Sequence, residues 1–188
     1  MKMRIGTLLI CCVIGVQGCG GGGGGDDAAF YGGVWRFSGI KFSDECNSGA
    51  DTAFNSVISV NQDENRVVAT SGQITLTGTT NDKDGFSVTA TAPAPNGCTY
   101  AYAYEFRNAS DGHADVGLGF ALQCGNRICA IGYGGPGVRD SNRSIAVDGA
   151  DDFSKLEGDF SEALVVDKGL DGESSVQEVV ADIAKTHR

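Results

Sequence analysis

Residues 98–122 read CTYAYAYEFRNASDGHADVGLGFAL, and the part from 98 to 106 alternates between two kinds of side chain. One kind is Cys98 followed by the aromatic residues Tyr100, Tyr102, Tyr104 and Phe106. The residues between them are small or polar. Successive side chains of a β-strand point to opposite faces, so this period of two predicts a strand with an aromatic ladder on one face.

A second alternating segment follows a turn signal at residues 108–112, which read NASDG. Its larger apolar side chains share one face, and glycines occupy the other face. The apolar set is Ala114, Val116, Leu118, Phe120 and Leu122. Two such segments around a short turn predict an antiparallel hairpin. A pairing of Arg107 with His113 would place Cys98 opposite Leu122.

Short segments with strand character lie on both sides of this hairpin. They are rich in threonine and valine, which favour half-buried strands, and turn signals separate them at short intervals. They are residues 33–42, 54–60, 66–70, 73–77, 86–91 and 130–133. The glycine-rich run 134–137 would end the last of them. We predict an all-β domain over residues 33–139, an antiparallel barrel or sandwich of about eight strands.

Residues 140–188 differ in character, since acidic side chains outnumber basic ones and aromatic residues become rare. Ser174 or Ser175 can cap a helix whose apolar residues lie on one face. Those residues are Val176, Val179, Val180 and Ile183. An earlier set with helical spacing is Phe153, Leu156, Phe160 and Leu164. We expect a short C-terminal helix that docks on the β domain; the alternative is a loose acidic tail that binds a partner.

The N-terminal segment has the pattern of an export signal. Lys2 and Arg4 precede an uncharged apolar run from Ile5 to Val16, which is shorter than the ~20 residues of a membrane-spanning helix. Val16-Gln17-Gly18-Cys19 then resembles the lipobox of bacterial lipoproteins. The resemblance implies cleavage after residue 18, lipidation of Cys19 with diacylglycerol and a palmitate-type acyl chain, and attachment to the outer membrane. Residues 19–32 would then form a glycine-rich tether.

Four cysteines remain beyond Cys19, an even number in an exported chain, and we predict that they form two disulfides. The preferred pairing is Cys124–Cys129 with Cys46–Cys98, and the second choice is Cys98–Cys124. A zinc site is the competing interpretation. It lacks the paired C-x₂-C spacing that such sites usually have.

Gly33-Val34-Trp35 resembles the G-x-W signature at the start of lipocalins and avidin-like barrels. This resemblance implies an eight-stranded barrel closed at one end by Trp35, with a late arginine across the ring, for which Arg139 is the candidate. The aromatic ladder, Tyr100, Tyr102, Tyr104 and Phe106, would then line a cavity for a small apolar ligand together with Trp35. The alternative is that these rings fill a solid core.

Composition argues against several other classes. The formal net charge of −10, without a basic cluster, disfavours nucleic acid as a partner. Only two histidines are present, His113 and His187, so we expect no catalytic triad, no metal site and no cofactor. The sequence thus predicts a non-catalytic binding module of the cell envelope. Its partner would be a small apolar ligand. The alternative is an envelope structural or protein-interaction module that uses the sheet surface and the acidic C-terminal segment.

Overall fold

The computed structural model describes residues 30–81, 84–140, 151, 153–157, 170–171 and 175–186. Several sequence predictions lie outside these residues. They are the export signal 1–18, the lipidation site Cys19, the glycine tether up to residue 29, and the apolar residues Phe160 and Leu164.

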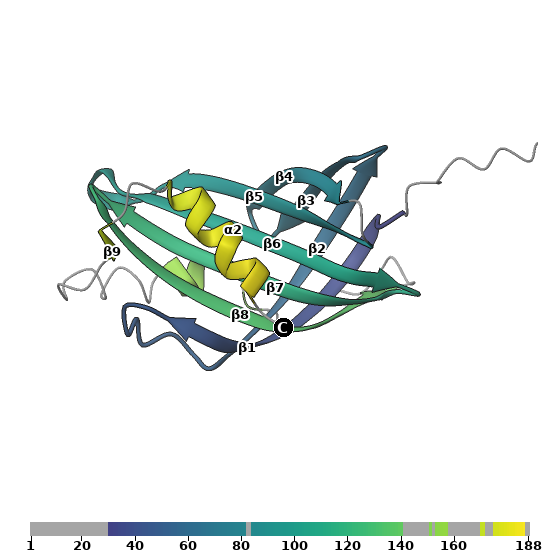
Figure 1. The fold of residues 1–188 in the computed structure, drawn as a ribbon, viewed down its shortest axis with the longest axis horizontal. Helices are drawn as coiled ribbons and strands as arrows, with labels where there is room; N and C mark the ends of the chain where they lie inside the picture. The colour runs from purple at the N-terminus through teal and green to yellow at the C-terminus, as the bar shows by residue number, and fades with distance from the viewer. Residues whose placement is uncertain are drawn as a thin grey trace, which may run out of the picture.

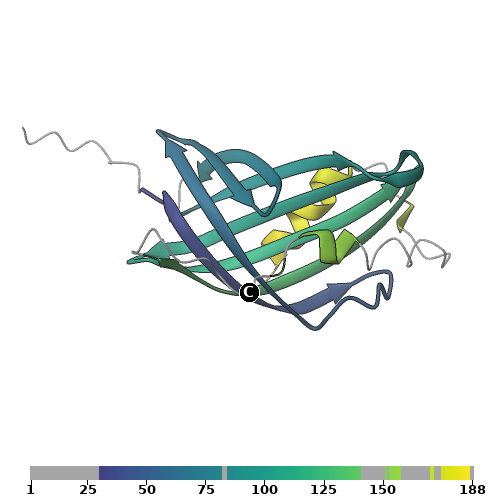
Figure 2. The same cartoon turned by 180° about the vertical axis from the view of Figure 1, so that it is seen from behind.

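Eight long strands form an antiparallel barrel, as Figures 1 and 2 show. They are β1 (Gly33–Asp44), β2 (Ala53–Asp63), β3 (Arg66–Ser71), β4 (Ile74–Asn81), β5 (Gly85–Pro93), β6 (Thr99–Ser110), β7 (His113–Cys124) and β8 (Arg127–Asp140). Each strand pairs with its neighbours in sequence, and β1 pairs with β8 to close the barrel. A short strand, β9 (Leu170–Asp171), adds to the start of β8, and a 3₁₀ turn (Pro95–Gly97) joins β5 to β6. The barrel alternative of the sequence prediction is therefore confirmed.

The β6–β7 hairpin exists as predicted, but its register differs by two residues. Arg107 pairs with Asp115, and Tyr100 pairs with Leu122. The tight turn lies at Asp111 and Gly112, whose φ angles of 48° and 80° suit the left-handed turn typical of two-residue hairpins. A register shift between Arg107 and Ser110 absorbs the residues that the prediction had assigned to the turn. A shift of two keeps every side chain on its predicted face.

Strand β8 is much longer than predicted, because residues 134–137 continue it instead of ending it. The glycines serve close packing in the wall. A methyl group on Gly135 would collide with the backbone carbonyl of Ser38 in β1, and one on Gly137 would collide with the Val116 side chain. Glycine in a strand marks such close approaches as well as turns, and the sequence alone does not distinguish them.

Alternation divides the wall into an inner and an outer face. Every strand from β1 to β8 contributes buried apolar side chains to one central cluster inside the barrel. The aromatic ladder belongs to this cluster, while the alanines between its members, Ala101 and Ala103, belong to a second cluster on the outside.

The outer cluster lies beneath helix α2 (Val176–Thr186), which packs across β6, β7 and β8 (Figure 1). Ser175 and Glu178 cap the helix reciprocally: Ser175 Oγ accepts from the Glu178 amide, and Glu178 Oε2 accepts from the Ser175 amide. A methyl group on Gly119 would collide with the carbonyl of Val180, so the outward glycines of β7 make room for the helix. The predicted docked helix is confirmed. In the described part of the chain, no helix is long and apolar enough to cross a membrane.

Candidate functional site

One end of the barrel is closed around Trp35; we call it the Trp35 end. Trp35 pairs with Arg139 across β1 and β8, and the guanidinium carbon of Arg139 lies 5.7 Å from the centre of the indole ring. The indole Nε1 donates a buried hydrogen bond of 2.9 Å to the carbonyl of Tyr31. The Arg–Trp contact expected from the G-x-W pattern is therefore present. This end is a structural closure, with the indole only 1% exposed.

Two open hollows lie on the surface of the Trp35 end. One, of about 360 Å³, runs between Trp35, Asp84 and Asp111, and the other, of about 770 Å³, lies beside Ser59 and Asp140. Phe30 and Arg139 line both hollows. Both are open to solvent, so neither encloses a ligand as a barrel interior can.

The aromatic ladder points into the barrel, and its rings pack against other rings. Phe106 stacks on Phe86 with ring centres 4.2 Å apart and meets Trp35 edge-on at 5.3 Å. Tyr104 meets Phe37 edge-on at 6.0 Å. These five residues show that aromatic side chains of the wall itself fill the half of the barrel near Trp35.

The other half of the ladder contacts a segment that is not part of the wall. Residues 153–157 form a short helix inside the curve of the sheet, on the face opposite α2 (Figure 2). Phe153 and Leu156 are each only 2% exposed and belong to the central cluster. The Phe153 ring lies 4.6 Å from Tyr102, 5.9 Å from Tyr104 and 6.4 Å from Phe120. We call residues 151–157 the plug segment, and the end of the barrel that it occupies, the mouth.

The plug segment joins the mouth through few polar contacts. The Asp151 amide donates to the Asn55 carbonyl, and Asp151 Oδ2 accepts from the Asn55 amide. Lys155 forms ion pairs with Asp51 at 2.8 Å and with Asp151 at 2.9 Å, which raise the pKa of its amino group. These ion pairs are exposed and contribute little stability. Burial of Phe153 and Leu156 contributes about 1.5–3 kcal/mol each and is the main attachment.

Glu157 meets the tyrosine hydroxyls of the ladder. Tyr102 donates a hydrogen bond of 2.6 Å to Glu157 Oε1, and Tyr100 donates a longer one of 3.4 Å to the Glu157 carbonyl. Burial, the hydrogen bond to Glu157 and the nearby negative charge all raise the pKa of Tyr102. Tyr102 is therefore a neutral donor at physiological pH, directed at a carboxylate.

Deeper in the barrel, Tyr104 and Ser56 share a hydrogen bond of 2.8 Å between their hydroxyl oxygens. Burial raises the pKa of Tyr104 to about 12 from its ordinary 10, although the hydrogen bonds with Ser56 and Ser71 lower it. The neutral phenol thus contributes stability that is fully present below pH 10 and is lost as the pH rises towards 12.

We predict that Tyr104→Phe weakens the alkaline loss of stability. Between pH 9 and pH 11, ionisation of Tyr104 in the unfolded chain should cost the parent about 1 kcal/mol of unfolding free energy. The variant should lack this contribution to the fall in unfolding free energy. Urea unfolding of both chains at pH 9 and at pH 11 measures the difference. The Ser56→Ala variant keeps the buried phenol and should retain the pH dependence. An equal fall with pH in the parent and in Tyr104→Phe would contradict the prediction.

Two disulfides frame the mouth, and their pairing corrects the preferred prediction. Cys98 bonds to Cys124, the second choice, because Thr99 pairs with Gln123 and places the two cysteines side by side with Cα atoms 4.4 Å apart. Cys46 bonds to Cys129. The Glu45 amide donates to the Ala130 carbonyl, so the loop after β1 runs beside the start of β8 and brings these cysteines together.

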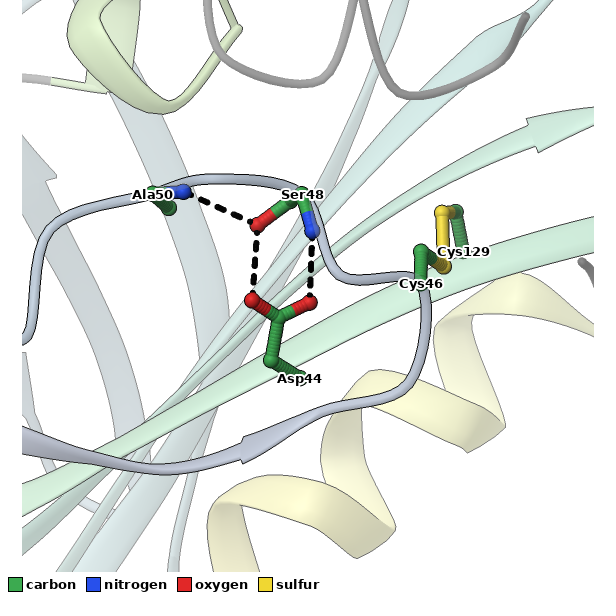
Figure 3. Close-up of a disulfide and its surroundings, with 5 residues drawn as sticks. All are labelled: Asp44, Cys46, Ser48, Ala50 and Cys129. Carbon is green, nitrogen blue, oxygen red and sulfur yellow. Dashed lines mark hydrogen bonds between the residues drawn. A yellow bond between two sulfur atoms is a disulfide. The ribbon is translucent and has the colours of Figure 1, made fainter. Parts of the chain in front are cut away.

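Figure 3 shows how the loop after β1 is ordered next to the Cys46–Cys129 disulfide. Asp44 accepts hydrogen bonds from the amide and hydroxyl of Ser48, and the Ser48 hydroxyl accepts from the Ala50 amide. Lys41 donates to Asp44 and to the Ala50 carbonyl. Burial of the Asp44 carboxyl opposes ionisation, but these hydrogen bonds outweigh it and lower its pKa. The loop is thus a rigid rim beside the mouth.

Sequence reasoning placed the ladder and Trp35 but missed the plug segment as part of the site. The spacing of Phe153 and Leu156 indicated a helix, yet nothing in it indicated that the helix enters the barrel. Within the described residues, no cluster of His, Cys, Asp and Glu could hold a metal ion. No model of a protein family, no curated protein and no solved structure matches this chain.

Proposed function

We propose that this protein is a lipid-anchored binding protein of the bacterial cell envelope, whose barrel takes a small apolar ligand at the mouth. The observation that carries the proposal is the occupancy of the mouth. Rings of the wall fill the half near Trp35, whereas Phe153 and Leu156, from a segment outside the wall, fill the half near the disulfides. A space filled by a separable segment is one that a ligand can enter.

The surroundings of the mouth suit an apolar ligand. Its wall includes Phe54, Tyr102 and Phe120, all fully or nearly fully buried, with a few hydroxyl groups among them. Apolar walls with a small number of placed polar groups are typical of small-molecule sites. The two disulfides would hold the wall in shape when the ligand enters.

The test uses Trp35, the single tryptophan of the chain. N-phenyl-1-naphthylamine absorbs where indole emits, so a probe held inside the barrel should quench Trp35 by energy transfer. We expect saturable quenching at one probe per chain in the full chain carrying Cys19→Ala, which removes the lipid. Heat-unfolded chain provides the control, since it exposes Trp35 without forming a site. Quenching that rises linearly and never saturates would contradict the proposal.

The location rests on Cys19 and on the position of the tether. Residue 30 lies at the Trp35 end, where β1 begins, so a tether that arrives there leaves the opposite end unobstructed. Two or three acyl chains on one cysteine give stable membrane attachment, whereas a single chain gives only marginal binding.

We predict that Cys19→Ala abolishes both the incorporation of a palmitate analogue and the recovery of the chain in the membrane fraction. Cys12→Ala is the matched control, because Cys12 lies in the predicted export signal and its loss should leave labelling unchanged. Metabolic labelling followed by gel fluorescence gives the readout. A Cys19→Ala chain that still takes up label would refute the lipid anchor.

A second candidate function is binding of another envelope protein through the outer wall. Three large apolar side chains are exposed on the paired strands β1 and β8: Ile40 at 64%, Phe42 at 40% and Val138 at 42%. Ile40 and Phe42 lie two residues apart in β1, and neighbouring exposed apolar groups often mark interaction surfaces. If the naphthylamine probe fails to bind, this surface becomes the better basis for function.

A further inference from the structure

We infer that the plug segment mimics the ligand, and that the ligand is therefore an apolar monocarboxylate. This inference rests on the proposed function and names the class of molecule that the mouth would take. Phe153 and Leu156 supply the apolar body, and the side chain of Glu157 supplies the carboxylate at its end.

The position of the apolar body defines how deep the ligand reaches. Phe153 contacts Tyr102 and Phe120 in the mouth and also Tyr104, which is buried near the middle of β6. Phe54 lies on the opposite side, with its ring 6.1 Å from that of Phe153. An alkyl chain or an aromatic ring in the place of Phe153 would meet the same four rings.

The position of the head group defines the charge. Tyr102 Oη lies 2.6 Å from Glu157 Oε1, and Tyr100 Oη lies close enough to donate to the Glu157 carbonyl. Hydrogen bonds from a neutral donor to a carboxylate are stronger than those to a neutral acceptor. When the plug segment leaves, both hydroxyls can donate to a carboxylate of the ligand, whereas a trimethylammonium head group cannot accept either hydrogen bond.

The attachment of the plug segment suits exchange. Apart from the contacts of Glu157, it is attached through two hydrogen bonds between Asp151 and Asn55 and through the exposed ion pair of Lys155 with Asp51. A ligand that must displace the segment can bind only to chains in which the mouth is free. Its observed affinity is therefore the intrinsic affinity multiplied by the fraction of such chains. Loss of the apolar anchors should raise that fraction and tighten binding.

The experiment measures decanoate binding by calorimetry to the full chain carrying Cys19→Ala, with decyltrimethylammonium as a probe of equal chain length and opposite charge. When Phe153→Ala and Leu156→Ala are both introduced into this chain, decanoate binding should tighten at least tenfold. Lys155→Ala is the matched control, since it removes an exposed side chain from the same helical turn and should change the affinity less than threefold. In the chain without the apolar anchors, where the plug segment no longer competes for the same hydroxyl, Tyr102→Phe should weaken decanoate about tenfold and leave the cation unchanged.

The outcomes separate this inference from the proposed function. If decanoate and the cation bind equally well and Tyr102→Phe changes neither affinity, the inference that the ligand is a carboxylate is wrong. The proposal of an apolar binding site would still hold in that case. Decanoate binding that is the same with and without the apolar anchors would overturn the mimicry. Failure of both probes and of the naphthylamine to bind the folded chain would overturn the proposed function as well. If the double variant does not fold by circular dichroism, Leu156→Ala alone carries the same test with a smaller gain.

Discussion

Replacing Trp35 with alanine is expected to lower the free energy of unfolding by about 4 kcal/mol, since removal of a large buried aromatic side chain usually costs about 3–5 kcal/mol. The indole is 1% exposed and packs edge-on against Phe106. Its loss also leaves the Tyr31 carbonyl without its buried donor, which adds to the cost. Urea unfolding followed by circular dichroism measures the change, because the variant has no tryptophan fluorescence.

Two variants serve as controls for this prediction. Trp35→Phe keeps an aromatic ring but loses the hydrogen bond to Tyr31, so it should cost clearly less than the alanine variant. Ile40→Ala removes an apolar side chain from the same strand at a position that is 64% exposed, and its effect should stay within about 0.5 kcal/mol. A loss below about 1 kcal/mol for Trp35→Ala would show that the indole does not close the barrel as described.

Local patterns in the sequence predicted the strands well. The alternation from Tyr100 to Phe106 and from Val116 to Leu122 places the same side chains inside the barrel as the structure does. The cap at Ser175 and the apolar stripe from Val176 predicted α2 for an equally local reason. Such features depend on residues only a few positions apart, and a single sequence contains them in full.

Features that depend on distant residues were predicted poorly. Closure of the barrel by β1 and β8 brings Cys46 to Cys129, and no local pattern indicates that these strands are neighbours. The glycine-rich run 134–137 looks like a turn because the groups that require its glycines lie far away in sequence. They are the carbonyl of Ser38 for Gly135 and the side chain of Val116 for Gly137. The Arg139 contact with Trp35 was expected only because the G-x-W resemblance implied it.

The plug segment shows the same limit at the functional site. Phe153 and Leu156 have the spacing of an amphipathic helix, and such helices usually cover the outside of a barrel, as α2 does. The inside was a possible location only if the wall left space at the mouth. That space depends on the side chains of several strands together, so the sequence could not reveal that Phe153 and Leu156 occupy it.

Removal of the Cys46–Cys129 disulfide should lower the free energy of unfolding by about 4 kcal/mol. This bond joins residues separated by 83 positions, against 26 for Cys98–Cys124. A cross-link stabilises the fold mainly by restricting the unfolded chain, and the effect grows slowly with the length of the closed loop. The loop lengths predict that the Cys46→Ala and Cys129→Ala pair loses up to about 1 kcal/mol more than the Cys98→Ala and Cys124→Ala pair.

The comparison of the two double variants is the decisive measurement, since both remove one buried or half-buried disulfide beside the mouth and leave the other intact. Urea unfolding under oxidising conditions gives both free energies. A smaller loss for the Cys46 and Cys129 variant than for the Cys98 and Cys124 variant would contradict the loop-length argument.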